Sequence, residues 1–257
     1  KMTFCSARYD SKFLPISKFH FNDRKLLLKK KLIHINDYLL NTKRCVMKNK
    51  IELLGYYGSD ETIACSAWTS TSRNLTDEKR KRVGKLIDML WSEGHETPFE
   101  KGVVHFLVDT DIASHIHLLK HRISSLNAES ARYKELKEDK SYIPEDWPEH
   151  WQDMLEHHTK ESDRLYHLCI EELTDCLGRK RAKESARFFK TYNSQIQADI
   201  MFNIRSFANF IKLRNSEHAQ KEIREIAQKM LDLVQNIEYN PFKHTLEAIN
   251  VRIHSNS

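Results

Sequence analysis

Charged and hydrogen-bonding side chains are concentrated between residues 120 and 132. Cations and neutral groups are interleaved there, with Lys120, His121, Arg122 and Arg132 set among Ser124, Ser125, Asn127 and Ser130. Cations provide charge for a phosphate, and hydroxyl and amide groups provide neutral hydrogen bonds to it. The segment therefore predicts a site for a phosphorylated ligand, with a solvated basic turn as the alternative.

Two further polar segments have the same character. The first, at residues 95–100, has the sequence His-Glu-Thr-Pro-Phe-Glu and follows an amphipathic pattern that Gly94 ends. In the second, Arg205 and Asn209 are four residues apart and should share one helix face. Arg214 and His218 follow at the point where Asn215 and Ser216 interrupt the helical pattern.

Together, the three segments resemble the flavin-dependent thymidylate synthases, and they occur in that family's order. The family carries an Arg-His-Arg sequence, seven residues and then Ser. Here Lys120 replaces the first Arg, whereas Arg122, seven residues and Ser130 keep the spacing. Three motifs in register are a more specific signal than one. The likeness extends from about residue 51 to about residue 237, and Ala128 stands where the family usually has Glu, with Glu129 next to it.

The resemblance implies that the protein methylates dUMP reductively to dTMP. The family takes its carbon from methylenetetrahydrofolate and its hydride from FAD that NADPH has reduced, and its homotetramer builds each site from several subunits. By position, the flavin contacts would be His95, Thr97, Glu100, Lys120, His121, Arg122, Asn127, Asn203, Arg205, Asn209 and His218. The dUMP contacts would be Glu129, Ser130, Arg132, Arg187 and Arg214, and Arg214 would be the catalytic residue that favours ionisation of uracil N3.

Three of these residues have a second interpretation. Ser130 would be a substrate ligand by resemblance, whereas a nucleophilic serine would require an adjacent base. Arg132 and Arg187 would contact the phosphate, but Arg187 could instead form a surface ion pair with Glu184, three residues before it. Arg214 could simply complement the dipole at the C-terminus of a helix.

The amino-acid composition limits the classes of protein to which the chain can belong. The chain has 257 residues, 40% hydrophobic and 30% charged, which suffices for one large domain with a core. Five cysteines, with no C-x-x-C pair, favour a reducing cytoplasm over a disulfide scaffold. No run approaches the roughly 20 apolar residues of a membrane span. His117 and His121 have the spacing of some zinc sites, but no third or fourth ligand is defined, so no metal is predicted.

The net charge of +6 leaves a rival function open, a nucleic-acid-binding module. Such a module would use the basic surface with aromatic residues such as Tyr133, Tyr142 and Trp147. Acidic residues, including Glu135 and Glu138, run through the same segments and weaken a continuous groove for a phosphate backbone. No nucleic-acid partner is therefore expected. A nucleotide-binding enzyme of different chemistry is the other rival.

The order of elements predicts an α+β fold, a single domain with long helices packed on a mixed or antiparallel sheet. Residues 1–50 form a basic extension of unknown role, and residues 51–257 form the domain. Strands are predicted at 51–54, 103–108 and 195–202, and helices after Thr76 and at 111–120, 149–177, 183–190 and 217–237. A loop is predicted after the helix at 111–120, whose buried stripe would be Ile112, Ile116, Leu119 and Ile123.

Overall fold

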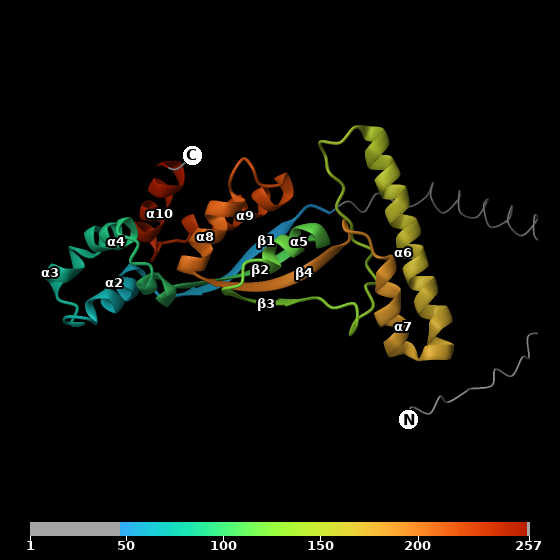
Figure 1. Cartoon of the computed structure of the whole chain (residues 1–257), viewed down its shortest axis with the longest axis horizontal. Helices are drawn as coiled ribbons and strands as arrows, with labels where there is room; N and C mark the ends of the chain where they lie inside the picture. The colour runs from blue at the N-terminus through green and yellow to red at the C-terminus, as the bar shows by residue number, and fades with distance from the viewer. Residues whose placement is uncertain (1–46, 256–257) are drawn as a thin grey trace, which may run out of the picture. The chain divides into compact units, whose positions relative to one another are not determined.

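Four antiparallel strands form one sheet in the order β1-β2-β4-β3. They are β1 Lys50–Tyr57, β2 Val103–Asp111, β3 Ser124–Ala128 and β4 Gln195–Asn203. The structure is a computed structural model that describes residues 47–255 (Figure 1). Of the predicted extension at 1–50, only residues 47–50 are described, and the remainder lies outside the described residues.

The central strands β2 and β4 have the alternation expected of strands with one buried face. They pair along their whole length, from Val103 opposite Asn203 to Asp111 opposite Gln195. The buried face carries fully buried side chains from both strands: Val104, Phe106, Val108, Ala198, Ile200 and Phe202. Each of the five larger side chains, all but Ala198, contributes about 1.5–3 kcal/mol through removal of its surface from water. This face therefore forms the centre of the core.

Three helices cover that face of the sheet (Figure 1). They are α5 Ile112–Leu119, α8 Ile204–Arg214 and α9 Lys221–Gln235. Helix α9 buries the side chains of Ile223, Ile226, Met230 and Val234, as its spacing predicts, although the helix begins at Lys221 rather than at residue 217. The helices α5 and α8 follow β2 and β4 directly.

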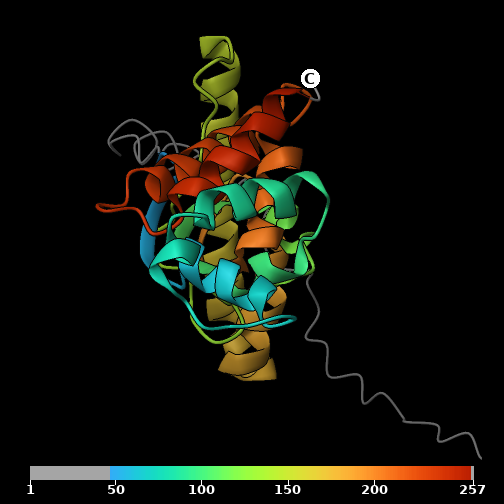
Figure 2. The same cartoon turned by 90° about the vertical axis from the view of Figure 1, so that its left-hand side faces the viewer.

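A second group of helices lies at one end of the sheet (Figure 2). It comprises α2 Asp60–Trp68, α3 Asp77–Arg80, α4 Val83–Ser92 and α10 Lys243–Ser255. Thr76 caps α3 as predicted, and α4 buries Val83, Ile87 and Leu90. The single helix predicted after Thr76 is wrong, because a turn at residues 81–82 separates α3 from α4. The short 3-10 helix η1 Thr97–Lys101 follows α4, so the His-Glu-Thr-Pro-Phe-Glu segment lies between α4 and β2.

A helical hairpin lies at the other end of the sheet (Figure 1). Its first helix is α6 Glu149–Leu177, which Gly178 ends as predicted, with a φ of 76°. Helix α7 Arg179–Ala186 runs back along α6 and passes into the 3-10 turn η2 Arg187–Phe189. The predicted helix at 183–190 is therefore wrong in its bounds, because Arg187 lies in η2 and not in the interior of an α-helix.

The segment after α5 is an edge strand, so the predicted loop at this place is wrong. Residues 124–128 pair antiparallel with β4, with Leu126 opposite Ile200 and packed against the core. Pairing with β4 satisfies backbone groups that a buried loop would leave unsatisfied. Along β3, Ser125 and Asn127 alternate with Leu126, so they point away from the core and are exposed.

The predicted buried stripe of α5 is also wrong. The helix rests on β2, β4 and α9 through Ser114, His115 and Leu118, whereas Leu119 is 52% and Ile123 66% exposed. Ile123 follows the end of the helix, so helical periodicity no longer determines its direction. The α+β class is confirmed, and the sheet is antiparallel. None of the helices that the structure describes could span a membrane.

Candidate active site

A cavity of about 540 Å³ lies along α8, beside the turn that joins α5 to β3. Its volume falls within the range of sites for small molecules and cofactors. Side chains from α4, the α5–β3 turn, α8 and α10 line it: Trp91, Glu96, Lys120, His121, Arg122, Ile123, Arg205, Ser206, Ala208, Asn209, Lys212, Leu213, Arg214 and Ile249. The lining therefore combines several cations with apolar side chains, a composition suited to an anionic ligand that also carries a flat apolar part.

Helix α8 presents one face to this cavity and the opposite face to the core. Asn203 caps the helix by accepting a hydrogen bond from the backbone N–H of Ser206 at 2.8 Å. Phe207 and Phe210 are buried, whereas Arg205 and Asn209, four residues apart, both line the cavity. The prediction that these two share one face of a helix is confirmed.

The α5–β3 turn brings the first polar segment to the same cavity. Asp111 caps α5 by accepting a hydrogen bond from the Ser114 backbone N–H at 2.8 Å. After α5 ends, the Ser124 hydroxyl donates to the backbone carbonyl of His121 at 2.6 Å, which closes the turn. Lys120, His121 and Arg122 consequently line the cavity opposite α8.

A hydrogen bond between Arg214 and His121 joins the two sides. Arg214 Nε donates to His121 Nε2 at 3.0 Å, and because a guanidinium only donates, His121 Nε2 must be unprotonated. Burial, then the charge of Arg214 and that of His117, lower the pKa of His121 to about 4. The His121 ring also packs edge-to-face on Phe210, with ring centroids 4.9 Å apart. Arg214 is therefore fixed at the end of α8 by a neutral imidazole.

The segment at 95–100 is tied to α8 by a double ion pair. Arg205 Nε donates to Glu96 at 2.8 Å, and its Nη1 donates to Glu100 at 2.7 Å. Because the pairs are partly exposed, their main effect is to orient η1 and not to stabilise the fold. Glu96 itself lines the cavity.

The predicted dUMP contacts other than Arg214 are not part of this lining. Glu129, Ser130 and Arg132 follow the end of β3, and Arg187 lies in η2. Ser130 Oγ accepts from the backbone N–H of Arg132 at 3.3 Å, and Glu129 forms an ion pair with Lys134 at 2.8 Å. Among the hydrogen bonds of the described residues, none joins Ser130 to a base. The chain therefore offers no support for the nucleophile interpretation of Ser130.

Arg132 and Arg187 lie near the same end of α7. Arg132 donates to Glu184 at 3.1 Å and 3.2 Å, and Arg187 follows Glu184 by three residues at the start of η2. Among the described side chains, Glu184 pairs with Arg132 and Arg181. The alternative ion pair of Arg187 with Glu184 is not formed, and Arg187 is exposed.

The other predicted flavin contacts are not part of the cavity lining. Thr97 and Glu100 lie in η1, and His95 precedes them. Asn127 lies on β3, and His218 is exposed in the connection between α8 and α9. Asn203 serves as the cap of α8, a role that its position at a strand-to-helix junction could have indicated.

Sequence reasoning missed several lining residues. Glu96 belongs to the motif at 95–100, so the motif could have identified it. Lys212 lies seven residues after Arg205 on α8, so helical spacing could have identified it. Trp91 at the end of α4 and Ile249 in α10 have no signal in the sequence, since only packing brings them here. In the described part of the chain, no group of three or more His, Cys, Asp or Glu side chains is arranged to hold a metal ion.

Comparison with known proteins identifies the class. Residues 52–238 match the family described as thymidylate synthase complementing protein. The chain is 31% identical over 191 residues to the flavin-dependent thymidylate synthase of Pseudothermotoga lettingae, covering 73% of this chain and 85% of that one. It is 29% identical over 220 residues to the enzyme of the same name from Clostridium tetani, covering 76% and 86%. These matches define a thymidylate synthase type of enzyme.

This chain belongs to the flavin-dependent thymidylate synthase family, which confirms the resemblance and makes the protein an enzyme. Its fold is similar to that of the UMP/dUMP methylase PolB from Streptomyces cacaoi, bound with 5-Br dUMP. The TM-score is 0.65 at 24% identity, over 80% of this chain and 96% of that one.

Proposed function

We propose that this enzyme methylates dUMP to dTMP, with methylenetetrahydrofolate as the carbon donor and NADPH-reduced FAD as the hydride source. The observation that carries the proposal is the cavity along α8, where Arg214 is fixed by His121 among further cations and apolar side chains. Family membership and the relatives' names support the chemistry. The PolB fold, seen with a 5-substituted dUMP, supports the nucleotide.

The donor set of the cavity fits a flavin dinucleotide. Lys120, Arg122 and Lys212 provide positive charge for a pyrophosphate, whereas Ile123 and Ile249 provide apolar contacts for a flat ring. Lys120 offers a point charge where the family usually has a planar Arg, so its contact with a phosphate would be single and not bidentate. Bound reduced flavin would supply the hydride.

Arg214 would act on the uracil. A guanidinium fixed in position stabilises negative charge at N3 and O4 of the ring as it develops, without reorganising at the moment of reaction. His121 would hold that guanidinium in place as a neutral acceptor, while Arg205 and Asn209 of the same helix face would contact the cofactor. No nucleophilic side chain is required, so Ser130 would serve as a ligand.

The nucleotide phosphate would be bound by Arg132 and Arg187, with Ser130 and Glu129 as neighbouring contacts. Arg132 pairs with Glu184, and a phosphate would compete for its bidentate donors. Glu129 pairs with Lys134, which keeps it beside the Ser130 turn. Glu129 would thereby take the contact of the family Glu that Ala128 lacks.

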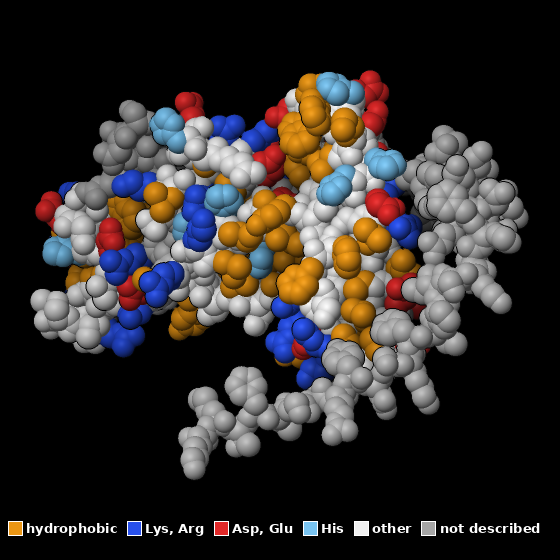
Figure 3. Space-filling model, turned by 45° about the vertical axis from the view of Figure 1, so that its right-hand side comes forward, with side chains coloured by type: hydrophobic (Ala, Val, Ile, Leu, Met, Phe, Trp, Pro, Cys, Tyr) orange, Lys and Arg blue, Asp and Glu red, His pale blue; other side chains and the backbone are white. Residues whose placement is uncertain are grey.

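We also propose that the enzyme is a homotetramer. Apolar side chains are exposed along the hairpin and on the adjoining face (Figure 3). Those of α6, η2 and the segment after it are Trp151, Met154, Leu168, Leu177, Phe188, Phe189 and Tyr192. Extended apolar surface of this kind marks an interaction site. Contacts between copies would also complete each site, since the predicted dUMP and flavin residues do not all converge within one chain.

The reaction would take place in a reducing cytoplasm. Cys65, Cys169 and Cys176 are free thiols in the described part of the chain, as expected of a protein without a disulfide framework.

The absorbance spectrum of the purified protein tests the proposal. Oxidised flavin should be visible, dUMP should perturb its spectrum, and dTMP should form on addition of methylenetetrahydrofolate and NADPH. A protein that reconstitutes with FAD but forms no dTMP from these substrates would contradict the proposed reaction.

A further inference from the structure

A segment at residues 129–142, which we call the strap, carries Glu129, Ser130 and Arg132 and connects β3 to the hairpin. It has no regular secondary structure over most of its length. Contacts with the hairpin determine its path instead. The backbone N–H of Leu136 donates to the hydroxyl of the fully buried Tyr166 at 3.0 Å. The Lys183 ammonium donates to the backbone carbonyl of Tyr133 at 2.7 Å.

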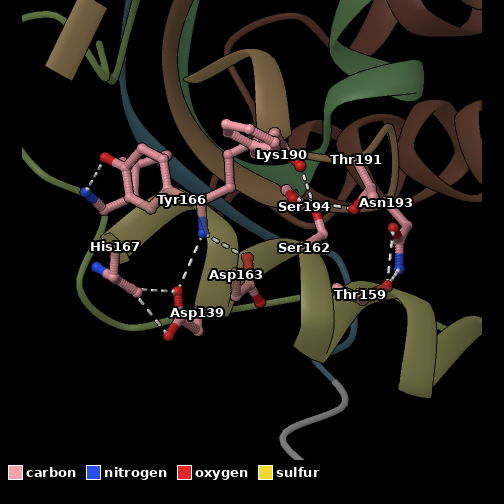
Figure 4. A network of polar contacts seen from close by, with 12 residues as sticks. Asp139, Thr159, Ser162, Asp163, Tyr166, His167, Lys190, Thr191, Asn193 and Ser194 are labelled. Atoms are coloured by element: carbon pink, nitrogen blue, oxygen red, sulfur yellow. Dashed lines mark hydrogen bonds and ion pairs between the residues drawn. The ribbon is translucent and has the colours of Figure 1, made fainter. Parts of the chain in front are cut away.

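Lys190 holds the other end of the strap. Its side chain is only 5% exposed, and its ammonium contacts Asp163 of α6 at 2.5 Å and Asp139 of the strap at 3.0 Å (Figure 4). The ammonium also lies over the ring of Tyr166, 4.5 Å from its centroid. One buried cation therefore joins the strap to α6.

Asp139 is held in an uncommon conformation by these contacts. Its φ is 45°, in the left-handed region that residues other than glycine rarely adopt. Its carboxylate is held from two sides, by Lys190 and by His167 Nε2 at 3.0 Å (Figure 4). A backbone conformation of this kind persists only where the surroundings fix it, and such residues are concentrated at functional sites.

Lys190 is also connected to the η2 turn that carries Arg187. The backbone N–H of Lys190 donates to the carbonyl of Arg187 at 3.1 Å. The Ser162 hydroxyl of α6 donates to the carbonyl of Phe189, so η2 is anchored to the same helix as the Lys190 ammonium. Lys190 thus contacts both the strap and the η2 turn.

We propose that Lys190 is a positioning residue for the nucleotide, which sets where Ser130 and Arg132 lie relative to Arg187. The inference rests on the proposed function, because it assumes that these three residues contact dUMP. Lys190 itself contacts no reacting atom. Its role is to hold together the two segments that carry Arg132 and Arg187, the proposed contacts of the nucleotide phosphate.

Charge explains why an apolar side chain cannot replace Lys190. Without the ammonium, the carboxylates of Asp139 and Asp163 face each other with no cation between them, and Asp163 is buried. Like charges repel each other, so loss of the cation between the two carboxylates should move the strap away from α6. The substitution Lys190→Arg would keep a cation at this place, with a different shape.

The test compares Lys190→Met, Lys190→Arg and Lys160→Met in the full holoenzyme. Lys160 is a matched control, because it also projects from the hairpin but pairs with Glu156 of the same helix. For Lys190→Met we expect the KM for dUMP to rise roughly tenfold or more, with flavin content and kcat at saturating dUMP within a few-fold of wild type. Lys190→Arg should recover much of the loss, and Lys160→Met should match wild type.

A purely structural role would lower the melting temperature of Lys190→Met and leave its KM for dUMP unchanged well below that temperature. That result would overturn the inference. If Lys190→Met does not fold, Asp139→Asn provides the same comparison, since it weakens the contacts of the strap while Asp163 keeps its cation, and an unchanged KM for dUMP would again overturn the inference. A wild-type enzyme without dTMP formation would instead count against the proposed function, so the two failures are distinguishable.

Discussion

Two features of the structure act on Arg214, the C-terminus of α8 and the neighbouring side chain of His121. The guanidinium is charged at every physiological pH, and the C-terminus of α8 favours a cation at this place. Its direction comes from the hydrogen bond to His121 at 3.0 Å. The two interpretations of the residue are therefore compatible, since a side chain that complements the helix dipole also lines the cavity.

Arg214→Ala should reduce dTMP formation far more than flavin binding. Loss of the group that stabilises charge on the uracil should cost a few kcal/mol in the transition state, roughly a hundredfold or more in rate. The measurement is kcat/KM for dUMP beside a flavin titration. Lys212→Ala provides the opposite comparison, because Lys212 lines the same cavity on the same helix but is assigned to the flavin, so its loss should weaken flavin binding more than turnover of dUMP. Normal turnover of dUMP by the Arg214 variant would refute the assignment.

Ser130→Ala should weaken dUMP binding and leave measurable turnover. A ligand hydroxyl contributes about 0.5–1.5 kcal/mol net, whereas loss of a nucleophile would reduce the rate by many orders of magnitude. Single-turnover oxidation of reduced flavin, followed by product analysis, distinguishes the two. Complete loss of dTMP at saturating dUMP, with flavin bound and the fold intact, would establish the nucleophile.

The stability of the ligand-free protein should depend on His121 in acid. The folded-state pKa of His121 is about 4, below its usual 6.5, so between these values the unfolded chain binds more protons than the folded one. Stability should therefore decrease as the pH falls from 6.5 towards 4, by on the order of 1–2 kcal/mol after allowance for solvent screening. Chemical denaturation of wild type and His121→Asn measures the difference. His218→Asn, at an exposed position, should retain the pH dependence of wild type, and an equal dependence in His121→Asn would exclude His121 as its source.

At the scale of helices and strands, the buried carboxylate of Asp60 connects α2 to α10. Asp60 at the start of α2 accepts hydrogen bonds from the backbone N–H groups of His244 and Thr245, at 2.7 Å and 3.1 Å. The Thr245 hydroxyl donates to the same carboxylate at 2.6 Å. Asp60 therefore supplies partners for the first amides of α10, which carries Ile249 to the cavity.

Asp60→Ala should destabilise the fold by about 2–3 kcal/mol, because buried donors at the start of α10 would lose their acceptor. Urea unfolding monitored by circular dichroism measures the change. Asp77→Ala is the control, since Asp77 is an exposed residue in the first turn of α3. Equal effects of the two substitutions would show that Asp60 does not link the helices.

At the scale of the whole molecule, several large apolar side chains are exposed to solvent. Leu119 and Ile123 remain exposed beside the cavity, and Phe188 on η2 is 81% exposed. Exposed apolar side chains of this kind are expected to be covered by copies of the chain in the proposed homotetramer.

The purified enzyme should therefore have about four times the 30.5 kDa mass of the chain. Light scattering at the protein concentration of the assay measures this mass. Phe188→Glu, on η2 and outside the cavity lining, should lower the mass, whereas Lys180→Glu on exposed α7 should leave it unchanged. A fully active monomer would contradict the proposal.

Features that depend on neighbours within a few turns were predictable from the sequence. The alternation of β2 and β4, the buried face of α9 and the end of α6 at Gly178 follow from period and local conformation. The motif residues also identified the family, since three segments keep their order and spacing. Lys120, His121, Arg122, Arg205 and Asn209, which were predicted to contact the flavin, do meet in one cavity with Arg214, which was predicted to act on dUMP.

Features that depend on distant contacts were decided only by the tertiary structure. His121 and Arg214 are 93 residues apart, and Asp139 and Lys190 are 51 apart, so their pairing depends on how complete elements pack. The same holds for β3, which is a strand because β4 offers a free edge, and for α5, whose buried face is chosen by β2, β4 and α9. Periodicity in a sequence shows that a helix has two faces, but only the surface against which it packs determines which face is buried.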